Sequence, residues 1–540
     1  MPLTQEQDAV VDAACGRARS VASTIVVEAG AGTGKTSTMV GVAKAKGRQR
    51  GLLTVFNRMM AEETKPRLVG TGCRSATLHS VAWSSEAAEP FRAGRGARLS
   101  QMLPARHAAE SVGIFGDVVI SGEVGPTSRN AVGYIVKDWV SRFCQSADPE
   151  LSVKHFPAGT LREFLPADMS KRAEESPDWF KMVARAYAQN LLPHAKKLWG
   201  MMSSPTGDFP SSHDVYLKLY VMSQPRIDYD YVGLDEAQDA NPIMLEFMRM
   251  AAQQGAQTLY VGDSHQQMYS WRGAVDALSQ IQADARLRLS HSFRFGPDVA
   301  QVANTVLGSL LYSDFRLVGA GRPSRVVDLM PSADAVICRT NACAIDMALA
   351  MREDGGRAGL CMDPSELVRE VDTLERFKKT GRSEARRFLQ FTSYEEVQEA
   401  VENGDAPDLK VLLDLIDKHD FDGTRQILSE IAVGKTPERI AASGADTIYL
   451  TAHASKGLEF PKVKLGEDFK GLEKLFELSD AKRREEYNIL YVAATRAQSE
   501  LCLGDSDAAK DLRQVMQAEA ATDAAVAAQK NSVGHDPIAA

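Results

Sequence analysis

The stretch VVEAGAGTGKTST, residues 26–38, decides the fold of this chain. Its apolar start predicts a buried strand over residues 25–27, its glycines predict a loop over residues 30–34, and a helix is expected over residues 35–40. A glycine-rich loop between a strand and a helix lets backbone amides surround phosphate oxygens. The stretch therefore predicts a nucleotide-phosphate site, and the alternative is a flexible glycine turn.

Each position of this loop has an expected role. A side chain at Gly32 or Gly34 would hold the backbone away from the phosphates. Lys35 is expected to reach the β- and γ-phosphates, and the Thr36 hydroxyl to ligate Mg²⁺. The strict pattern has glycine at position 29, where alanine fits if its φ is negative. We expect the nucleotide to contact Ala29, Gly30, Ala31, Gly32, Thr33, Gly34, Lys35, Thr36 and Ser37.

The composition limits the class of protein. The 540 residues suffice for two to four domains, and 63 Lys+Arg against 71 Asp+Glu exclude a uniformly basic surface but allow a basic groove. No apolar run approaches the roughly 18–20 residues that span a bilayer, and the first residues lack the apolar core of a signal peptide. We therefore expect a cytoplasmic protein without a membrane partner.

The cysteines and histidines give no metal-binding spacing. The seven cysteines are dispersed without a Cys-x-x-Cys pair, which suits a reducing cytosol. A zinc or iron–sulfur site is not expected. The expected metal is Mg²⁺ that arrives with the nucleotide.

Two adjacent carboxylates follow an apolar strand at residues 231–234. Asp235 and Glu236 are costly to hold near a core unless a cation or a reaction uses them. Asp235 is expected to hold Mg²⁺ through water, and Glu236 to orient and deprotonate an attacking water. The next strand, over residues 258–261, places Gln266 where it can sense a γ-phosphate. The alternative for the acidic pair is an ordinary acidic turn.

Aromatic and polar side chains follow further strands. Open α/β sheets bind ligands at the carboxyl ends of their strands, and aromatic side chains beside polar groups suit stacking on an unpaired base. The alternative for Phe56 and Trp271 is a place in the core. The candidates are Phe56, Asn57, Thr77, His79, Tyr269, Trp271 and Arg272.

The pattern of strands and helices divides the chain. We expect a first sheet domain from residues 1–80 and 220–275, interrupted by a helical insertion at 81–219. A second sheet domain is expected from residues 276–354 and 444–505, with a smaller helical insertion at 355–443. The alanine-rich tail, residues 506–540, is expected to be disordered.

The ordered motifs resemble superfamily 1 DNA helicases of the UvrD/Rep/PcrA type, and most closely their F-box DNA helicase branch. They are LTQEQ, AGAGTGKT, VFNRMMAEE, TLHS, LDEAQD, VGDSHQQMYSWRGA, SFRFG, TAHASKGLEF followed by VKLGEDF, and LYVAATRA. SFRFG and VKLGEDF favour that branch, although no F-box precedes the motifs and no nuclease domain is expected after them. The resemblance implies an α/β fold of two RecA-like P-loop domains with parallel sheets, each carrying a mainly α-helical insertion.

The resemblance also implies roles for matched positions. Gln7 and Phe293 look like adenine contacts, Gly457 and Glu459 like further nucleotide contacts, with Glu459 at the ribose. Arg294 and Arg496 look like arginine fingers from the second domain, which act with the hydrolytic set Lys35, Thr36, Asp235, Glu236 and Gln266. The resemblance places the single-strand track at Phe56, Thr77, His79, Tyr269 and Trp271, and we add Asn57, Arg272 and His453 as candidates.

The expected function is an ATP-driven motor that moves on single-stranded DNA and unwinds duplex, with 3′-to-5′ polarity implied by the resemblance alone. Its expected cofactors are ATP and Mg²⁺, its partners are single-stranded DNA and single/double-strand junctions, and a monomer is favoured. Two alternatives stay open. One is a motor that strips proteins from DNA with little unwinding, and the other is a nucleotide-gated DNA-binding subunit of a nuclease or defence complex.

Overall fold

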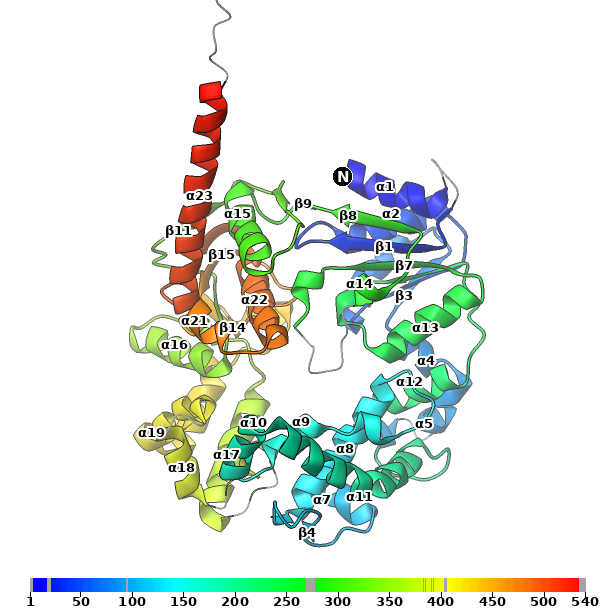
Figure 1. Cartoon of the computed structure of the whole chain (residues 1–540), viewed down its shortest axis with the longest axis vertical. Coiled ribbons are helices and arrows are strands. Elements are labelled where there is room, and N and C mark those ends of the chain that lie inside the picture. The colour runs from blue at the N-terminus through cyan, green and yellow to red at the C-terminus, as the bar shows by residue number, and fades with distance from the viewer. Residues whose placement is uncertain are drawn as a thin grey trace, which may run out of the picture.

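The structure is a computed structural model that describes residues 3–16, 21–93, 96–268, 277–381, 383, 385–389, 391, 393–402 and 406–533. Two six-stranded sheets, each wholly parallel, form the frame of these residues (Figure 1). Within them, no helix combines the length and the hydrophobicity needed to cross a bilayer.

The first sheet has the strand order β3-β2-β6-β7-β1-β8. The central strand β1 is apolar, and its residues Ile25 to Val27 are at most 2% exposed because sheet neighbours and helices cover it. Helices α1 (Gln5–Cys15) and α2 (Lys35–Lys46) pack against each other beside it. The strands are β1 (Thr24–Ala29), β2 (Gly51–Thr54), β3 (Cys73–Ala76), β6 (Tyr231–Leu234), β7 (Gln257–Gly262) and β8 (Ala285–Leu289).

The second sheet has the strand order β11-β16-β15-β12-β14-β13. Helix α22 (Asp480–Ala494) is buried from Tyr487 onward and faces the first domain, while α15 (Pro297–Thr305) and α16 (Asn341–Glu353) cover the sheet elsewhere. The fold is therefore α/β with two RecA-like domains, as predicted. The strands are β11 (Arg325–Val327), β12 (Ala335–Cys338), β13 (Ala358–Leu360), β14 (Thr447–Thr451), β15 (Phe460–Leu465) and β16 (Ala497–Cys502).

A mainly helical insertion interrupts the first sheet. It packs around the buried side chains of Trp139, Phe143 and Tyr187, and its described strands are the short antiparallel pair β4 (Val118–Val119) and β5 (Pro126–Thr127). Its larger helices are α7 (Ala105–Ser111), α8 (Arg129–Gln145), α9 (Ala158–Glu163), α10 (Ala167–Glu175), α11 (Pro177–Ser203) and α12 (His213–Met222).

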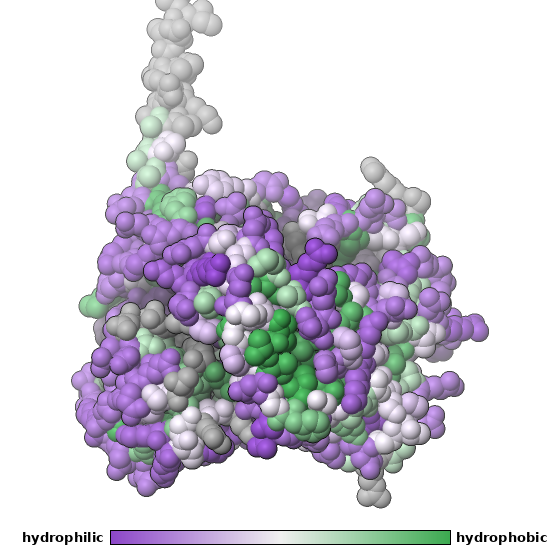
Figure 2. All heavy atoms as spheres, turned by 60° about the horizontal axis from the view of Figure 1, so that its bottom comes forward, coloured by the Kyte–Doolittle hydropathy of each residue, from purple (hydrophilic) through white to green (hydrophobic). Residues whose placement is uncertain are grey.

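The second insertion is smaller, and its core around Phe377 and Leu428 continues into the second sheet domain. Its helices are α17 (Pro364–Thr380), α18 (Tyr394–Glu402), α19 (Pro407–Ile431) and α20 (Pro437–Ala442). In Figure 1 the two insertions lie side by side below the two sheets, and an ion pair between Arg386 and Glu163 joins them. Figure 2 shows a largely hydrophilic face with an apolar patch near its centre. Exposed apolar side chains of the first insertion include Met102, Phe115, Val119 and Met182.

Two strands lie outside the predicted bounds. The sequence pattern predicts that the second domain starts at residue 276, but β8 pairs with β1 in the first sheet. Strand β13 falls inside the predicted second insertion, yet it pairs with β14 at the edge of the second sheet. Both are edge strands, and strand pairing depends on residues far away in the sequence, so local pattern could not assign them. The remaining domain bounds stay predictions.

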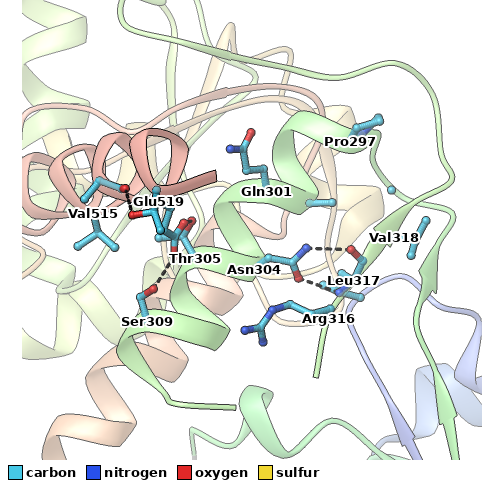
Figure 3. A pocket seen from close by; sticks show the side chains of 14 residues that line it. Pro297, Gln301, Asn304, Thr305, Ser309, Arg316, Leu317, Val318, Val515 and Glu519 are labelled. Atoms are coloured by element: carbon cyan, nitrogen blue, oxygen red, sulfur yellow. Dashed lines mark hydrogen bonds between the residues drawn. The ribbon is translucent and has the colours of Figure 1, made fainter. Parts of the chain in front are cut away.

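The predicted disorder of the tail is wrong for helix α23 (Asp507–Val533). Alanine is the strongest helix former, and Ala508, Ala509 and Leu512 are buried against the second domain. Farther along, the Glu519 carboxylate accepts hydrogen bonds from the hydroxyls of Thr305, at 2.6 Å, and Ser309 (Figure 3). The groove of about 850 Å³ beside these contacts, between α15 and α23, is lined by none of the predicted site residues.

Candidate active site

The phosphate loop joins β1 to α2 in the predicted conformation. Gly32 and Gly34 have φ of +73° and +80°, which other residues adopt only with strain, while the φ of Ala29 is not positive. A Cβ at Gly32 would lie 2.6 Å from Ser292 Oγ and 2.7 Å from Arg294 Cβ. Glycine is therefore needed at position 32 both for the turn and because Ser292 and Arg294, which follow the first sheet, approach so closely.

The first turn of α2 faces the acidic pair at the end of β6. Thr36 Oγ1 donates to Asp235 Oδ2 at 2.8 Å, and Lys35 Nζ lies 3.0 Å from Glu236 Oε2. Burial, aided by the charge of Glu236, raises the pKa of Asp235 to about 6. Burial acts to raise the pKa of Glu236 too, but the Lys35 ammonium outweighs it and holds that pKa at about 2. Glu236 is thus ionised at neutral pH.

Gln266 lies between the two domains. Its Nε2 donates to Asp263 Oδ2 at 2.7 Å, and its Oε1 accepts from Arg496 Nη2 at 3.4 Å. Arg496 is 1% exposed, and burial together with the neighbouring charge of Arg294 lowers its pKa to about 9. Arg294 Nη1 donates to the Thr495 carbonyl at 2.9 Å. The two predicted arginine fingers therefore stand next to each other at the domain boundary.

The predicted adenine contacts flank Gly34. Gln7 is buried, forms a capping box with Thr4 at the start of α1, and donates through Nε2 to the Thr33 carbonyl at 3.3 Å. A Cβ at Gly34 would lie 2.9 Å from Gln7 Nε2 and 3.9 Å from Phe293 Cε2. Phe293 is 43% exposed, so its ring is accessible beside the loop.

Three other predicted nucleotide contacts are engaged differently or lie open. Glu459 Oε2 accepts from Arg294 Nε at 2.8 Å, so in this structure it is engaged with a predicted arginine finger. Ser37 Oγ accepts from Arg67 Nη2 at 2.7 Å. Gly457 has a φ of +86°, and a Cβ at this position would point into open space. Their contacts with nucleotide stay predictions.

The donor set fits a triphosphate with Mg²⁺. The loop glycines leave a cradle that side chains would fill, and Lys35 supplies positive charge at its end. Thr36 and Asp235 offer the oxygen ligands that Mg²⁺ prefers.

The predicted DNA-binding residues follow neighbouring strands, as expected. Thr77 accepts a hydrogen bond from the Ser80 amide at the start of α4 (Leu78–Trp83), and Asn57 caps α3 (Arg58–Thr64) in the same way. His79 Nε2 lies 2.9 Å from Asp214 Oδ1, and Phe56 is 40% exposed. Contact with DNA stays a prediction for all of them.

Of the remaining predicted DNA contacts, His453 is described by the structure and lies beside Met268. Burial lowers the pKa of His453, which opposes protonation at neutral pH, and its ring bonds to the backbone of Met268. Tyr269, Trp271 and Arg272 lie outside the described residues.

Several residues that join the domains here were not assigned a role from the sequence. Lys456 pairs with Asp239 and donates to the Gln266 carbonyl at 3.2 Å, and Asn488 donates to the Gln267 carbonyl at 3.0 Å. Lys456, Asp239 and Asn488 lie in or beside the quoted motifs. Their position near the motifs could have indicated a role. Sequence spacing could not, because their partners lie more than 180 residues away.

A group of possible metal ligands is also invisible in the sequence spacing. Cys338, Cys343 and Asp468 each bring one ligand atom within 4.8 Å of the others. The Asp468 carboxylate already accepts hydrogen bonds from the backbone of Arg339 and Thr340. The two cysteines come from a strand end and the following helix, a proximity that spacing alone does not reveal.

Two family models match the chain. The UvrD/REP helicase N-terminal domain matches residues 162–285, and the UvrD-like helicase C-terminal domain matches residues 366–506. The chain is 28% identical to F-box DNA helicase protein 1 of Schizosaccharomyces pombe, over 93% of this chain and 57% of that protein. It is 27% identical to F-box DNA helicase 1 of Gallus gallus, over 93% of this chain and 49% of that protein.

A shorter similarity extends to bacterial proteins. DNA helicase II of Escherichia coli is 28% identical over 116 residues, which cover 19% of this chain and 16% of that protein. The chain spans about half the length of the F-box helicases that it matches.

Proposed function

The chain belongs to the UvrD/Rep family of superfamily 1 helicases, and we propose that it is an ATP-driven motor that moves on single-stranded DNA and unwinds duplex from 3′ to 5′. The proposed cofactors are ATP and Mg²⁺. The proposed substrates are single-stranded DNA and its junctions with duplex. The proposed role lies in DNA repair, recombination or replication, and we expect the protein to act as a monomer. The polarity rests on the family resemblance.

One observation carries the proposal. Groups from both sheet domains converge on one place: Lys35, Glu236 and Gln266 from the first, Arg294 and Arg496 from the second. A simple phosphate-binding enzyme has no need of two arginines supplied by a separate domain. A motor that couples ATP hydrolysis to domain movement needs such arginines, because they make hydrolysis depend on the position of the second domain.

The proposed chemistry assigns each group a step. Lys35 and the loop amides bind the phosphates, and Thr36 with Asp235 would hold Mg²⁺, which when bound neutralises phosphate charge. Glu236 orients a water and takes its proton on a carboxylate oxygen. Arg294 and Arg496 stabilise the negative charge that develops, an effect worth about 10³–10⁵ in rate for arginine fingers.

The proposed stroke follows from the position of the arginines. Since they belong to the second domain, hydrolysis requires the domains to be closed, and product release lets them separate. Phe56 follows the carboxyl end of β2 and His79 follows that of β3, where they would hold bases during that movement. Base stacking on aromatic rings contributes about 1–3 kcal/mol per base, comparable with the roughly 1.4 kcal/mol of a DNA stacking step.

The test uses the purified chain with tailed duplexes. We expect ATPase activity that single-stranded DNA stimulates, and unwinding of a duplex with a 3′ tail. Lys35→Ala should abolish both, because it removes the cation that binds the phosphates. ATPase activity that DNA does not stimulate, or that survives Lys35→Ala, would overturn the proposal, and unwinding from a 5′ tail alone would overturn the polarity.

A further inference from the structure

Tyr491 crosses the domain boundary from helix α22. Its side chain is fully buried, and its hydroxyl accepts a hydrogen bond from the Ala31 amide of the phosphate loop at 3.3 Å. The same hydroxyl donates to Asp263 Oδ2 at 3.2 Å. One oxygen of the second domain therefore contacts both the phosphate loop and a buried carboxylate of the first.

Asp263 connects this contact to the proposed hydrolytic residues. Its Oδ2 also accepts from Gln266 Nε2 at 2.7 Å, and its backbone amide donates to Gln238 Oε1 at 2.9 Å. Gln238 Nε2 in turn donates to Glu236 Oε2 at 2.5 Å. A continuous chain of hydrogen bonds thus runs from Tyr491 to the proposed sensor and the proposed base.

The surroundings leave the hydroxyl little freedom. The Tyr491 ring meets His265 edge-on at 6.1 Å between centroids, and both residues are buried. Burial and the Asp263 charge raise the pKa of Tyr491 well above its usual value, so the hydroxyl remains a donor at neutral pH. Arg496, which follows the end of the same helix, reaches Gln266 directly. Helix α22 therefore approaches Gln266 by two routes.

We propose that Tyr491 is a positioning residue that makes ATP hydrolysis depend on domain closure. When α22 is seated, its hydroxyl fixes the phosphate loop at Ala31 and holds Asp263 so that Gln266 and Glu236 are correctly aimed. When the domains separate, both contacts break together. The inference rests on the proposed ATP hydrolysis, and Tyr491 itself touches no substrate.

The experiment compares Tyr491→Phe with the wild-type chain in DNA-stimulated ATPase assays. Phenylalanine keeps the ring and the buried volume but removes the hydroxyl. We expect kcat to fall about tenfold, because the hydroxyl no longer holds Ala31 and Asp263 in place, while KM for ATP stays within about twofold.

The matched control is Tyr187→Phe. Tyr187 is equally buried and its hydroxyl bonds to Thr127 Oγ1, but it lies in the first insertion. This variant should leave kcat unchanged. A fall in kcat of the same size in both variants would mean that loss of a buried hydroxyl acts through general stability, and would overturn the proposal.

A double variant supplies a readout that a purely structural role would not move. If Tyr491 acts through Gln266, Tyr491→Phe should lower kcat less than about twofold further in a Gln266→Ala background. Full additivity, or wild-type kcat in Tyr491→Phe, would overturn the inference while wild-type hydrolysis stands. A wild-type chain without DNA-stimulated hydrolysis would overturn the proposed function and this inference with it.

Discussion

Glu236 pairs a strained backbone with a fixed carboxylate. Its φ of +53° is left-handed, a conformation that costs a residue other than glycine about 1–2 kcal/mol. Lys35 Nζ at 3.0 Å and Gln238 Nε2 at 2.5 Å hold its carboxylate in place. Such strain persists where surrounding contacts over-determine the geometry, as they do in active sites. The turn thereby places the carboxylate beside Lys35 at the end of the phosphate loop.

Replacing Glu236 by glutamine tests its role as a base. The amide has the same size but takes no proton, so we expect kcat to fall about 10²–10⁴-fold while nucleotide affinity changes only a few-fold. Steady-state ATPase assays and titration with a fluorescent nucleotide give the two quantities. Glu246→Gln, on α13 (Pro242–Gln253), where Glu246 is partly exposed and pairs with Arg249, should leave kcat within twofold. Activity above half of wild type in Glu236→Gln would remove Glu236 from the mechanism.

Local spacing in the sequence predicts part of the candidate site. Lys35 and Thr36 follow a glycine loop, and their contacts with Glu236 and Asp235 follow from placing both motifs at one sheet edge. Tyr491 could not be found in this way. It lies 460 residues from Ala31 in the sequence, and in the apolar second half of a helix a tyrosine is indistinguishable from a core residue.

At the scale of elements, local pattern predicted the central strands of the first sheet and misassigned the edge strands β8 and β13. Strand β8 alternates between exposed and partly buried positions, and its pairing with β1 assigns it to the first sheet. Strand β13 has three residues, too few for a period to be read. The prediction for α23 is wrong because alanine-rich composition is compatible with a frayed end, whereas Ala508 and Leu512 form an apolar stripe that packs.

Helix α12 carries a buried lysine with a testable pH dependence. Lys218 Nζ donates to the carbonyls of Ser146 and Asp148, at 2.7 and 2.6 Å, and lies 4.2 Å from the centre of the Phe143 ring. Burial lowers its pKa from 10.5 to about 8. The unfolded chain therefore binds more protons between about pH 8 and 10.5, and stability rises with pH in that window.

We expect this insertion to gain about 1–2 kcal/mol of unfolding free energy between pH 8 and 9.5, relative to Lys218→Met, because one pKa unit is worth about 1.36 kcal/mol. Denaturant titrations followed by tryptophan fluorescence would report it, since Trp139, Trp179 and Trp199 lie in the insertion. Parallel pH profiles for the two proteins would show that Lys218 does not titrate as expected.

At the scale of the whole molecule, the described residues include contacts between the two sheet domains and contacts between the two insertions. The sheet domains are joined by Tyr491 at the phosphate loop and by Lys456 at the Gln266 carbonyl. Arg386 joins the insertions, which lie side by side in Figure 1. Arg386 Nε and Nη2 lie 2.8 and 3.0 Å from the Glu163 carboxylate, and Nη2 is 3.1 Å from Thr160 Oγ1. The first contact is buried and the second is exposed. The insertions should therefore separate more easily than the sheet domains.

Charge exchange at the second contact tests this difference. Arg386→Glu places two carboxylates together, and since an exposed ion pair is worth about 0.2–1 kcal/mol, we expect the separated population to rise by up to about fivefold. Fluorescence energy transfer between dyes on α11 and α19 would measure it. The double variant Arg386→Glu with Glu163→Arg should restore the wild-type distance. Arg387→Glu is the control, because Arg387 pairs with Glu370 inside the second insertion and should leave the distance unchanged. An unchanged signal in Arg386→Glu would mean that other contacts hold the insertions together, and movement of the insertions would then require the sheet domains to part first.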